Sequence, residues 1–139
     1  MLLVRILVVD DFCPWRGLIL QQLSLFGDMR VVGVAGDGLE AVEKAEEFQP
    51  DLVLLDIRLP TLNGIEAARQ IRQRVPQAKI LFVSSSADVD VVRAALNAGG
   101  HGYVLKWDAA VALVPGIKAI LRGEKFVSSS ILGFTESQE

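Results

Sequence analysis

The chain has 139 residues, of which 51% are hydrophobic and 22% charged, so its length and composition predict one globular domain and exclude a disordered or fibrous protein. No apolar run approaches the roughly 18 residues of a membrane span, and Met1–Arg5 lacks the features of a signal peptide, so we expect a cytoplasmic protein with no membrane partner. The net charge of -3 without a basic stripe argues against direct nucleic-acid binding by this domain, and the single cysteine, Cys13, excludes an internal disulfide.

The first half of the chain predicts three strands separated by two helices. Apolar and β-branched runs at 5–9, 30–35 and 52–55 are typical of strands. The last of these is apolar throughout, which is typical of a strand buried on both faces. Apolar residues recur at helical spacing from Trp15 to Phe26 and again from Ala41 to Phe48. The predicted order is therefore strand, helix, strand, helix, strand.

The second half continues the same alternation. A third helix is expected from Ile65 to Val75, and a fourth strand at 79–83 follows it. A fourth helix carries its apolar positions from Val91 to Leu96, and a fifth strand follows at 102–105. Asp108 can then cap a final helix.

Five strands that alternate with five helices predict a doubly wound α/β fold. Parallel strands need long crossover connections, and helical crossovers cover both faces of the sheet. We expect a flavodoxin-like, five-stranded parallel sheet in the order 2-1-3-4-5, with the ligand crevice at the carboxyl ends of the strands. Residues 1–125 would form the domain, and residues 126–139, with a serine run at 128–130 and a polar end, a C-terminal tail or linker remnant.

Polar residues directly follow four of the predicted strands: Asp10 and Asp11, Asp56, Ser84, and Lys106. All would lie at one edge of the sheet. Three carboxylates at one edge repel one another unless a cation joins them, and their oxygen atoms suit Mg²⁺. The ammonium of Lys106 and the hydroxyl of Ser84 would complete a cage for a phosphoryl group. The pattern predicts that Asp56 is a nucleophile that forms an aspartyl-phosphate.

This combination resembles the receiver domain of bacterial two-component response regulators, over about residues 3–125. The similar positions are an acidic pair, the phosphoacceptor, two residues of the loop after it, a Thr/Ser position and a lysine: Asp10, Asp11, Asp56, Pro60, Gly64, Ser84 and Lys106. The run 102–106 is similar to receivers that precede a LuxR-type DNA-binding domain, and Tyr103 takes the place of the switch aromatic residue of the family.

The resemblance implies a magnesium-dependent phosphoryl transfer to Asp56. The donor would be a sensor histidine kinase, a phosphotransfer protein or a small phosphodonor. Ser84 and Lys106 would stabilise the phosphoryl group, and the chain would catalyse only its own phosphorylation and dephosphorylation, so it would not be an enzyme in the ordinary sense. The implied ligands of Mg²⁺ are Asp10, Asp11, Asp56 and the backbone carbonyl of Arg58.

The resemblance also implies a conformational switch. Ser84 would move toward the phosphoryl group and Tyr103 would turn inward, which changes the face formed by the fourth helix, fifth strand and fifth helix. That face would allow a phosphorylation-dependent homodimer. Arg58 and Ser86 stand at positions that influence how long the phosphoryl group survives. Whether a DNA-binding output domain belongs to the protein is left open.

Two alternatives remain at this point. A pseudo-receiver would dock partners without being phosphorylated. A phosphohydrolase of the haloacid dehalogenase type would also use a strand-end aspartate and Mg²⁺, but that family wants an acid where this chain has Arg58. Trp15 and Trp107 are both predicted near the site, whereas Cys13 and His101 are given no role.

Overall fold

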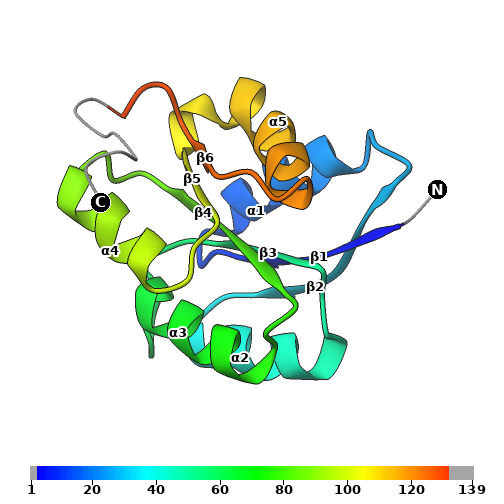
Figure 1. Cartoon of the computed structure of the whole chain (residues 1–139). Helices are drawn as coiled ribbons and strands as arrows, with labels where there is room; N and C mark the ends of the chain where they lie inside the picture. Colours follow the sequence, from blue (N-terminus) through cyan, green and yellow to red (C-terminus); the bar gives the residue numbers. More distant parts are fainter. Residues whose placement is uncertain (1–2, 132–139) are drawn as a thin grey trace.

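The computed structural model describes residues 3–131 and contains one six-stranded parallel sheet (Figure 1). Its order is β2-β1-β3-β4-β5-β6, so the predicted doubly wound order of the first five strands is confirmed. The strands are β1 (Val4–Val9), β2 (Met29–Ala35), β3 (Leu52–Leu55), β4 (Lys79–Ser84), β5 (Gly102–Leu105) and β6 (Phe126–Val127).

Five helices cover the two faces of the sheet. The helices are α1 (Cys13–Leu23), α2 (Gly38–Phe48), α3 (Gly64–Arg74), α4 (Val89–Asn97) and α5 (Ala109–Leu121), and a short 3-10 turn, Lys106–Asp108, precedes α5. Figure 1 shows α2, α3 and α4 on one face and α1 and α5 on the other. Between residues 3 and 131, no helix is long and apolar enough to cross a membrane.

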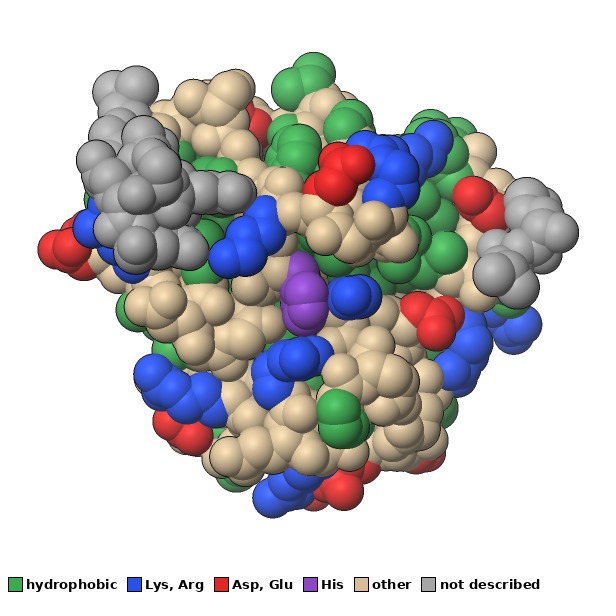
Figure 2. Space-filling model, viewed as in Figure 1, with side chains coloured by type: hydrophobic (Ala, Val, Ile, Leu, Met, Phe, Trp, Pro, Cys, Tyr) green, Lys and Arg blue, Asp and Glu red, His purple; other side chains and the backbone are tan. Residues whose placement is uncertain are grey.

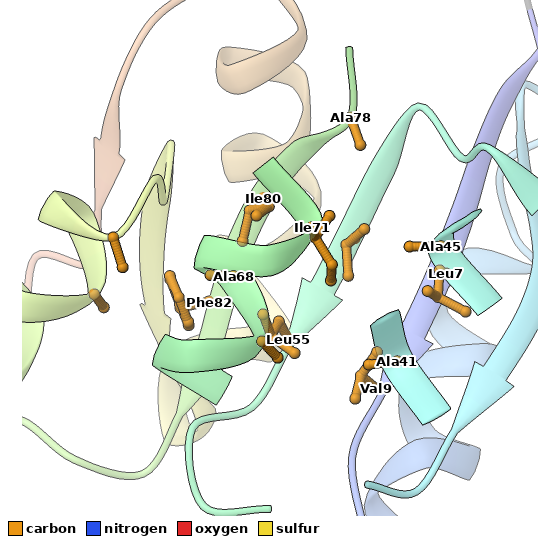
Figure 3. Packing of buried hydrophobic residues seen from close by; sticks show 14 of the residues in the cluster. Leu7, Val9, Ala41, Ala45, Leu55, Ala68, Ile71, Ala78, Ile80 and Phe82 are labelled. Atoms are coloured by element: carbon orange, nitrogen blue, oxygen red, sulfur yellow. The ribbon is translucent and has the colours of Figure 1, made fainter. Parts of the chain in front are cut away.

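Small residues let the helices of the first face approach the sheet closely. Ala41 and Ala45 of α2 are fully buried against β1, and Ala68 and Ile71 of α3 pack toward β3 and β4 (Figure 3). All four residues of β3 are buried, as its apolar sequence predicts. The site at the end of β3 therefore rests on a densely packed strand.

The second face has a separate apolar core. Alternate residues of β1, such as Ile6 and Val8, point to this side and pack with Ile19 of α1 and Leu113 of α5. The alternation follows from strand geometry, in which successive side chains lie on opposite faces. Both faces of the central strands are thus buried under helices.

Residues 126–131, which we call the strap, pack on the domain although the sequence predicts a tail there. Phe126–Val127 forms β6 and pairs with β5, which adds a sixth strand to the expected five. Ser128 and Ile131 are 2% and 6% exposed. The remainder of the predicted tail, 132–139, lies outside the described residues, so the domain boundary itself stays a prediction.

The strap also corrects the expectation that Asp108 caps α5. In the structure the Asp108 side chain accepts no hydrogen bond from the N–H groups of the first turn of that helix. Its Oδ1 instead accepts a hydrogen bond of 2.9 Å from the hydroxyl of Ser130. The short turn between β5 and α5 is therefore joined to the strap.

Candidate functional site

The carboxyl ends of four strands bring the predicted site residues to one edge of the sheet. Asp10 directly follows β1, Asp56 follows β3, Ser84 ends β4 and Lys106 follows β5. Asp10, Asp56 and Ser84 are each at most 5% exposed. Since buried polar groups need partners, the contacts between these side chains decide whether the arrangement is stable.

Lys106 joins the two buried carboxylates. Its Nζ lies 2.7 Å from Oδ2 of Asp10 and 3.1 Å from Oδ2 of Asp56. The ammonium also lies 5.3 Å from the centre of the Trp15 ring. The ammonium of Lys106 therefore pairs with two carboxylates, and Asp10, Asp56 and Lys106 together carry a net negative charge when all three are ionised.

Burial and charge act against each other on the pKa values of Asp56 and Lys106. It raises the pKa of Asp56 above its usual value despite the opposing charge of Lys106, and the nearby charge of Asp10 adds to the increase. Burial alone would disfavour the ammonium of Lys106, but its hydrogen bond to Asp10 and the charge of Asp56 together raise its pKa. Lys106 therefore offsets only part of the effect of burial on the pKa of Asp56.

The acidic residues form a cluster that fits a divalent cation. Asp10, Asp11 and Asp56 each offer a carboxylate oxygen, and these oxygens lie within 4.8 Å of one another. Asp11 is exposed, so the cluster opens to solvent on one side. A set of oxygen donors that leaves room for water is the type that Mg²⁺ prefers.

A second opening lies beside Asp56. A cavity of about 140 Å³ is lined by Asp56, Arg58, Ser84, Ser85 and Ser86. The Oγ of Ser84 accepts a hydrogen bond of 3.1 Å from the backbone N–H of Ser86, which orders the serine segment. Polar groups thus surround the space that a group attached to Asp56 would enter.

The loop after Asp56 depends on a close approach at Gly64. The backbone N–H of Gly64 donates a hydrogen bond of 2.7 Å to the carbonyl of Ile57. A Cβ atom at Gly64 would lie 1.9 Å from the carbonyl oxygen of Asp56. Only glycine leaves room for this turn.

The same loop is tied to the start of α2. The N–H of Gly38 donates to the carbonyl of Pro60 at 3.1 Å, and the hydroxyl of Thr61 donates to Oδ1 of Asp37 at 3.0 Å. Asp37 also caps α2 by accepting from the N–H of Glu40. The loop is therefore anchored on the side away from Ser84.

Tyr103 lies inside the protein. Its side chain is fully buried, and its hydroxyl donates a hydrogen bond of 2.7 Å to the carbonyl of Ser86. Burial raises its pKa. The sequence leads us to expect an inward turn upon phosphorylation, whereas the structure already has this side chain inward and joined to the wall of the cavity.

Two contacts of the site could not be found by pattern. Trp15 is expected near the site, but its ring contact with Lys106 depends on how α1 packs beside α5. Ser128 of the strap accepts a hydrogen bond of 3.1 Å from the N–H of Leu105, next to Lys106, and no periodicity in the sequence indicates this contact.

Cys13, to which the sequence gives no role, is exposed, and its Sγ accepts a hydrogen bond of 3.2 Å from the guanidinium of Arg16.

His101 lies at the opposite, amino-terminal edge of the sheet and takes no part in the site. Its Nδ1 accepts a hydrogen bond of 3.0 Å from the N–H of Ile80. Burial, with the charges of Arg72, Lys79 and Lys125, lowers its pKa to about 4. Figure 2 shows the histidine among Lys and Arg side chains.

The chain belongs to the response regulator receiver domain family, whose model matches residues 6–118. It is 34% identical over 128 residues to the transcriptional regulatory protein DegU of Brevibacillus brevis, a match that covers 92% of this chain and 54% of DegU. It is 36% identical over 129 residues to the response regulator protein VraR of Staphylococcus aureus, with 93% and 62% covered. The chain therefore spans between half and two thirds of the length of these relatives.

A solved structure agrees with this assignment. The two-component response regulator of the LuxR family from Aurantimonas sp. SI85-9A1 superposes with a TM-score of 0.88 at 36% identity, covering 93% of this chain and 92% of that one. The resemblance proposed from the residues at the strand ends is thus confirmed at the level of the family and the fold.

Proposed function

We propose that this receiver domain accepts a phosphoryl group on Asp56 in a magnesium-dependent reaction. The observation that carries the proposal is the position of Asp56, which is 5% exposed, 3.1 Å from the ammonium of Lys106, and at the wall of a cavity of about 140 Å³. A buried carboxylate beside one fixed cation and an open space is suited to nucleophilic attack.

In the proposed transfer, an Oδ atom of Asp56 attacks the phosphorus of the donor. The new P–O bond forms as the P–N bond to a donor histidine breaks, and the electron pair of that bond stays on the histidine nitrogen. The proposed ligands of Mg²⁺ are Asp10, Asp11, Asp56 and the carbonyl of Arg58, and the bound ion supplies positive charge for the phosphoryl oxygens.

The remaining roles follow from the positions around the cavity. Lys106 would place its ammonium against the phosphoryl oxygens, and Ser84 would donate a hydrogen bond from its hydroxyl. Arg58 and Ser86 line the same cavity, so their size and polarity would control the access of water and hence the lifetime of the phosphoryl group.

The signal would leave through Tyr103 and the face of α4, β5 and α5. Because Tyr103 already contacts Ser86, a movement of the serine segment would change the packing around this tyrosine. We expect a sensor histidine kinase or a phosphotransfer protein as donor and a phosphorylation-dependent homodimer as one outcome. A cytoplasmic location stays a prediction.

The intact mass of the protein tests the proposal. With Mg²⁺ and acetyl phosphate or phosphoramidate, the wild type should gain the mass of one phosphoryl group, and Asp56→Asn should gain none. Asp51→Asn is the matched control because Asp51 is exposed at the other edge of the sheet, and this variant should be labelled like the wild type. An unlabelled wild type would favour a pseudo-receiver. Continuous release of phosphate from an external phosphoester would favour a phosphohydrolase.

A further inference from the structure

Trp15 contacts the one cation that joins the site carboxylates. Its ring is half-buried in α1, and the Nζ of Lys106 lies 5.3 Å from the ring centre. The other tryptophan, Trp107, follows Lys106 in the chain but is 62% exposed. Trp15 thus has a ring contact with the ammonium, whereas Trp107 is only the chain neighbour of Lys106.

The ammonium needs a partner that does not bind metal. Lysine has a flexible four-carbon stem and acts as a compact charge, so its position depends on what holds its end. In this structure Asp10 and Asp56 hold it, at 2.7 Å and 3.1 Å. Both carboxylates are also the proposed ligands of Mg²⁺, so metal binding competes for the contacts that hold Lys106.

The aromatic ring provides such a partner. The face of an indole attracts a cation through its quadrupole and carries no charge, and tryptophan is the strongest of the aromatic residues in this respect. Trp15 packs against the apolar core formed with α1 and α5, which fixes its ring beside the site. Only 17% of the Lys106 side chain is exposed, so water competes weakly for this contact.

We infer that Trp15 is a positioning residue that holds the ammonium of Lys106 at Asp56 during phosphoryl transfer. The inference rests on the proposed function. In this role Trp15 acts through Lys106, since its contact is with the ammonium and it takes no part in the bond changes at phosphorus.

Two substitutions distinguish the effect of the aromatic ring of Trp15 from the effect of its size. Trp15→Leu keeps an apolar side chain without the π face, and we expect the rate constant of phosphorylation by phosphoramidate at saturating Mg²⁺ to fall about threefold to tenfold. Trp15→Phe keeps a ring face and should recover most of the rate. Trp107→Leu, next to Lys106 but exposed, should react like the wild type. The donor concentration at half-maximal rate should not change.

The fluorescence of Trp15 gives a readout that does not depend on the reaction. The chain has two tryptophans, so Trp107→Phe leaves Trp15 as the only tryptophan, whose emission can be excited selectively over that of the single tyrosine. In that background Lys106→Met should change the emission because it removes the ammonium from the ring face. Lys118→Met is the matched control, since Lys118 lies 5.5 Å from the ring of Phe26 instead. It should leave the emission unchanged.

The outcomes separate this inference from the proposed function. A wild type that takes up no phosphoryl group overturns both. A wild type that is phosphorylated while Trp15→Leu and Trp15→Phe react at the same rate overturns the inference alone. The inference about Trp15 is also overturned if Lys106→Met leaves the emission of Trp15 unchanged.

Discussion

The two edges of the sheet bury titratable groups in opposite ways. At the carboxyl edge, Asp10 and Asp56 are buried beside Lys106. At the amino edge, His101 is half-buried as an acceptor for the N–H of Ile80, and its low pKa keeps it neutral. The first edge holds charges that the fold must compensate, whereas the second holds a neutral hydrogen bond. The proposed chemistry therefore lies at the edge that holds buried charges, and the other edge holds a buried polar group without charge.

The largest expected effect comes from removing the cation of the carboxyl edge. Lys106→Met leaves Asp10 and Asp56 buried without their partner, and we expect the free energy of unfolding at pH 7 to fall by about 3 kcal/mol. Mg²⁺ should restore part of this loss if it binds the acidic cluster. Urea denaturation with and without Mg²⁺ measures both effects.

Lys79→Met is the control at the amino edge. Lys79 lies near His101 and is not in an ion pair among those found in residues 3–131, so its loss should change stability by less than about 0.5 kcal/mol. Equal losses of unfolding free energy in Lys106→Met and Lys79→Met would contradict the proposed difference between the two edges.

The two edges should also respond to acid with opposite signs. The pKa of His101 is lowered from 6.5 to about 4, so below pH 6.5 the unfolded chain binds a proton that the folded chain does not. This should remove about 1–2 kcal/mol of stability between pH 6.5 and pH 4, after allowance for solvent screening. The raised pKa of Asp56 acts the other way, because the folded chain binds its proton first as the pH falls toward 3.8.

Two variants isolate these contributions in the absence of Mg²⁺. His101→Asn keeps an oxygen acceptor for the N–H of Ile80 but does not titrate, so its stability should fall less than that of the wild type between pH 6.5 and pH 4. Asp56→Asn removes the compensating group, so its stability should fall more. Parallel curves for the wild type and His101→Asn would rule out the role given to the histidine.

The smallest expected effect tests whether the carboxyl edge is sensitive only because of its charges. Ser128→Ala leaves the N–H of Leu105 buried without its acceptor, and we expect a loss of about 1 kcal/mol that is independent of Mg²⁺. Ser129→Ala is the control, since Ser129 is exposed. Urea denaturation and amide exchange at Leu105 measure the change. A magnesium-dependent loss would instead connect the strap to the acidic cluster.

Much of the fold could be predicted because its signals are local. Four of the five apolar runs, such as the one that ends at Asp56, end abruptly in a polar residue, and parallel strands bring such ends to one edge. That single geometric fact is sufficient to place Asp10, Ser84 and Lys106 near Asp56 from the residue pattern alone. The roles of these residues in phosphoryl transfer remain predictions.

The contacts that could not be predicted join segments far apart in the chain. A strand of two residues, Phe126–Val127, has no detectable period, and its pairing with β5 depends on the path of the chain after α5. The ring contact of Trp15 with Lys106 and the hydrogen bond of His101 to Ile80 likewise arise from packing. A residue pattern reports which side chains are buried, but it does not report which distant atom each one meets.

The loop after Asp56 makes the two sides of the site unequal in their restraints. Hydrogen bonds from Gly38 and Thr61 tie this loop to the start of α2 on one side. On the other side Asp56 borders a cavity walled by the serine segment, which Tyr103 contacts. Hydrogen bonds therefore restrain Asp56 on the side of α2, whereas the cavity leaves space on the side of β5. In the proposed switch, a displacement at Asp56 would therefore pass toward β5 more readily than toward α2.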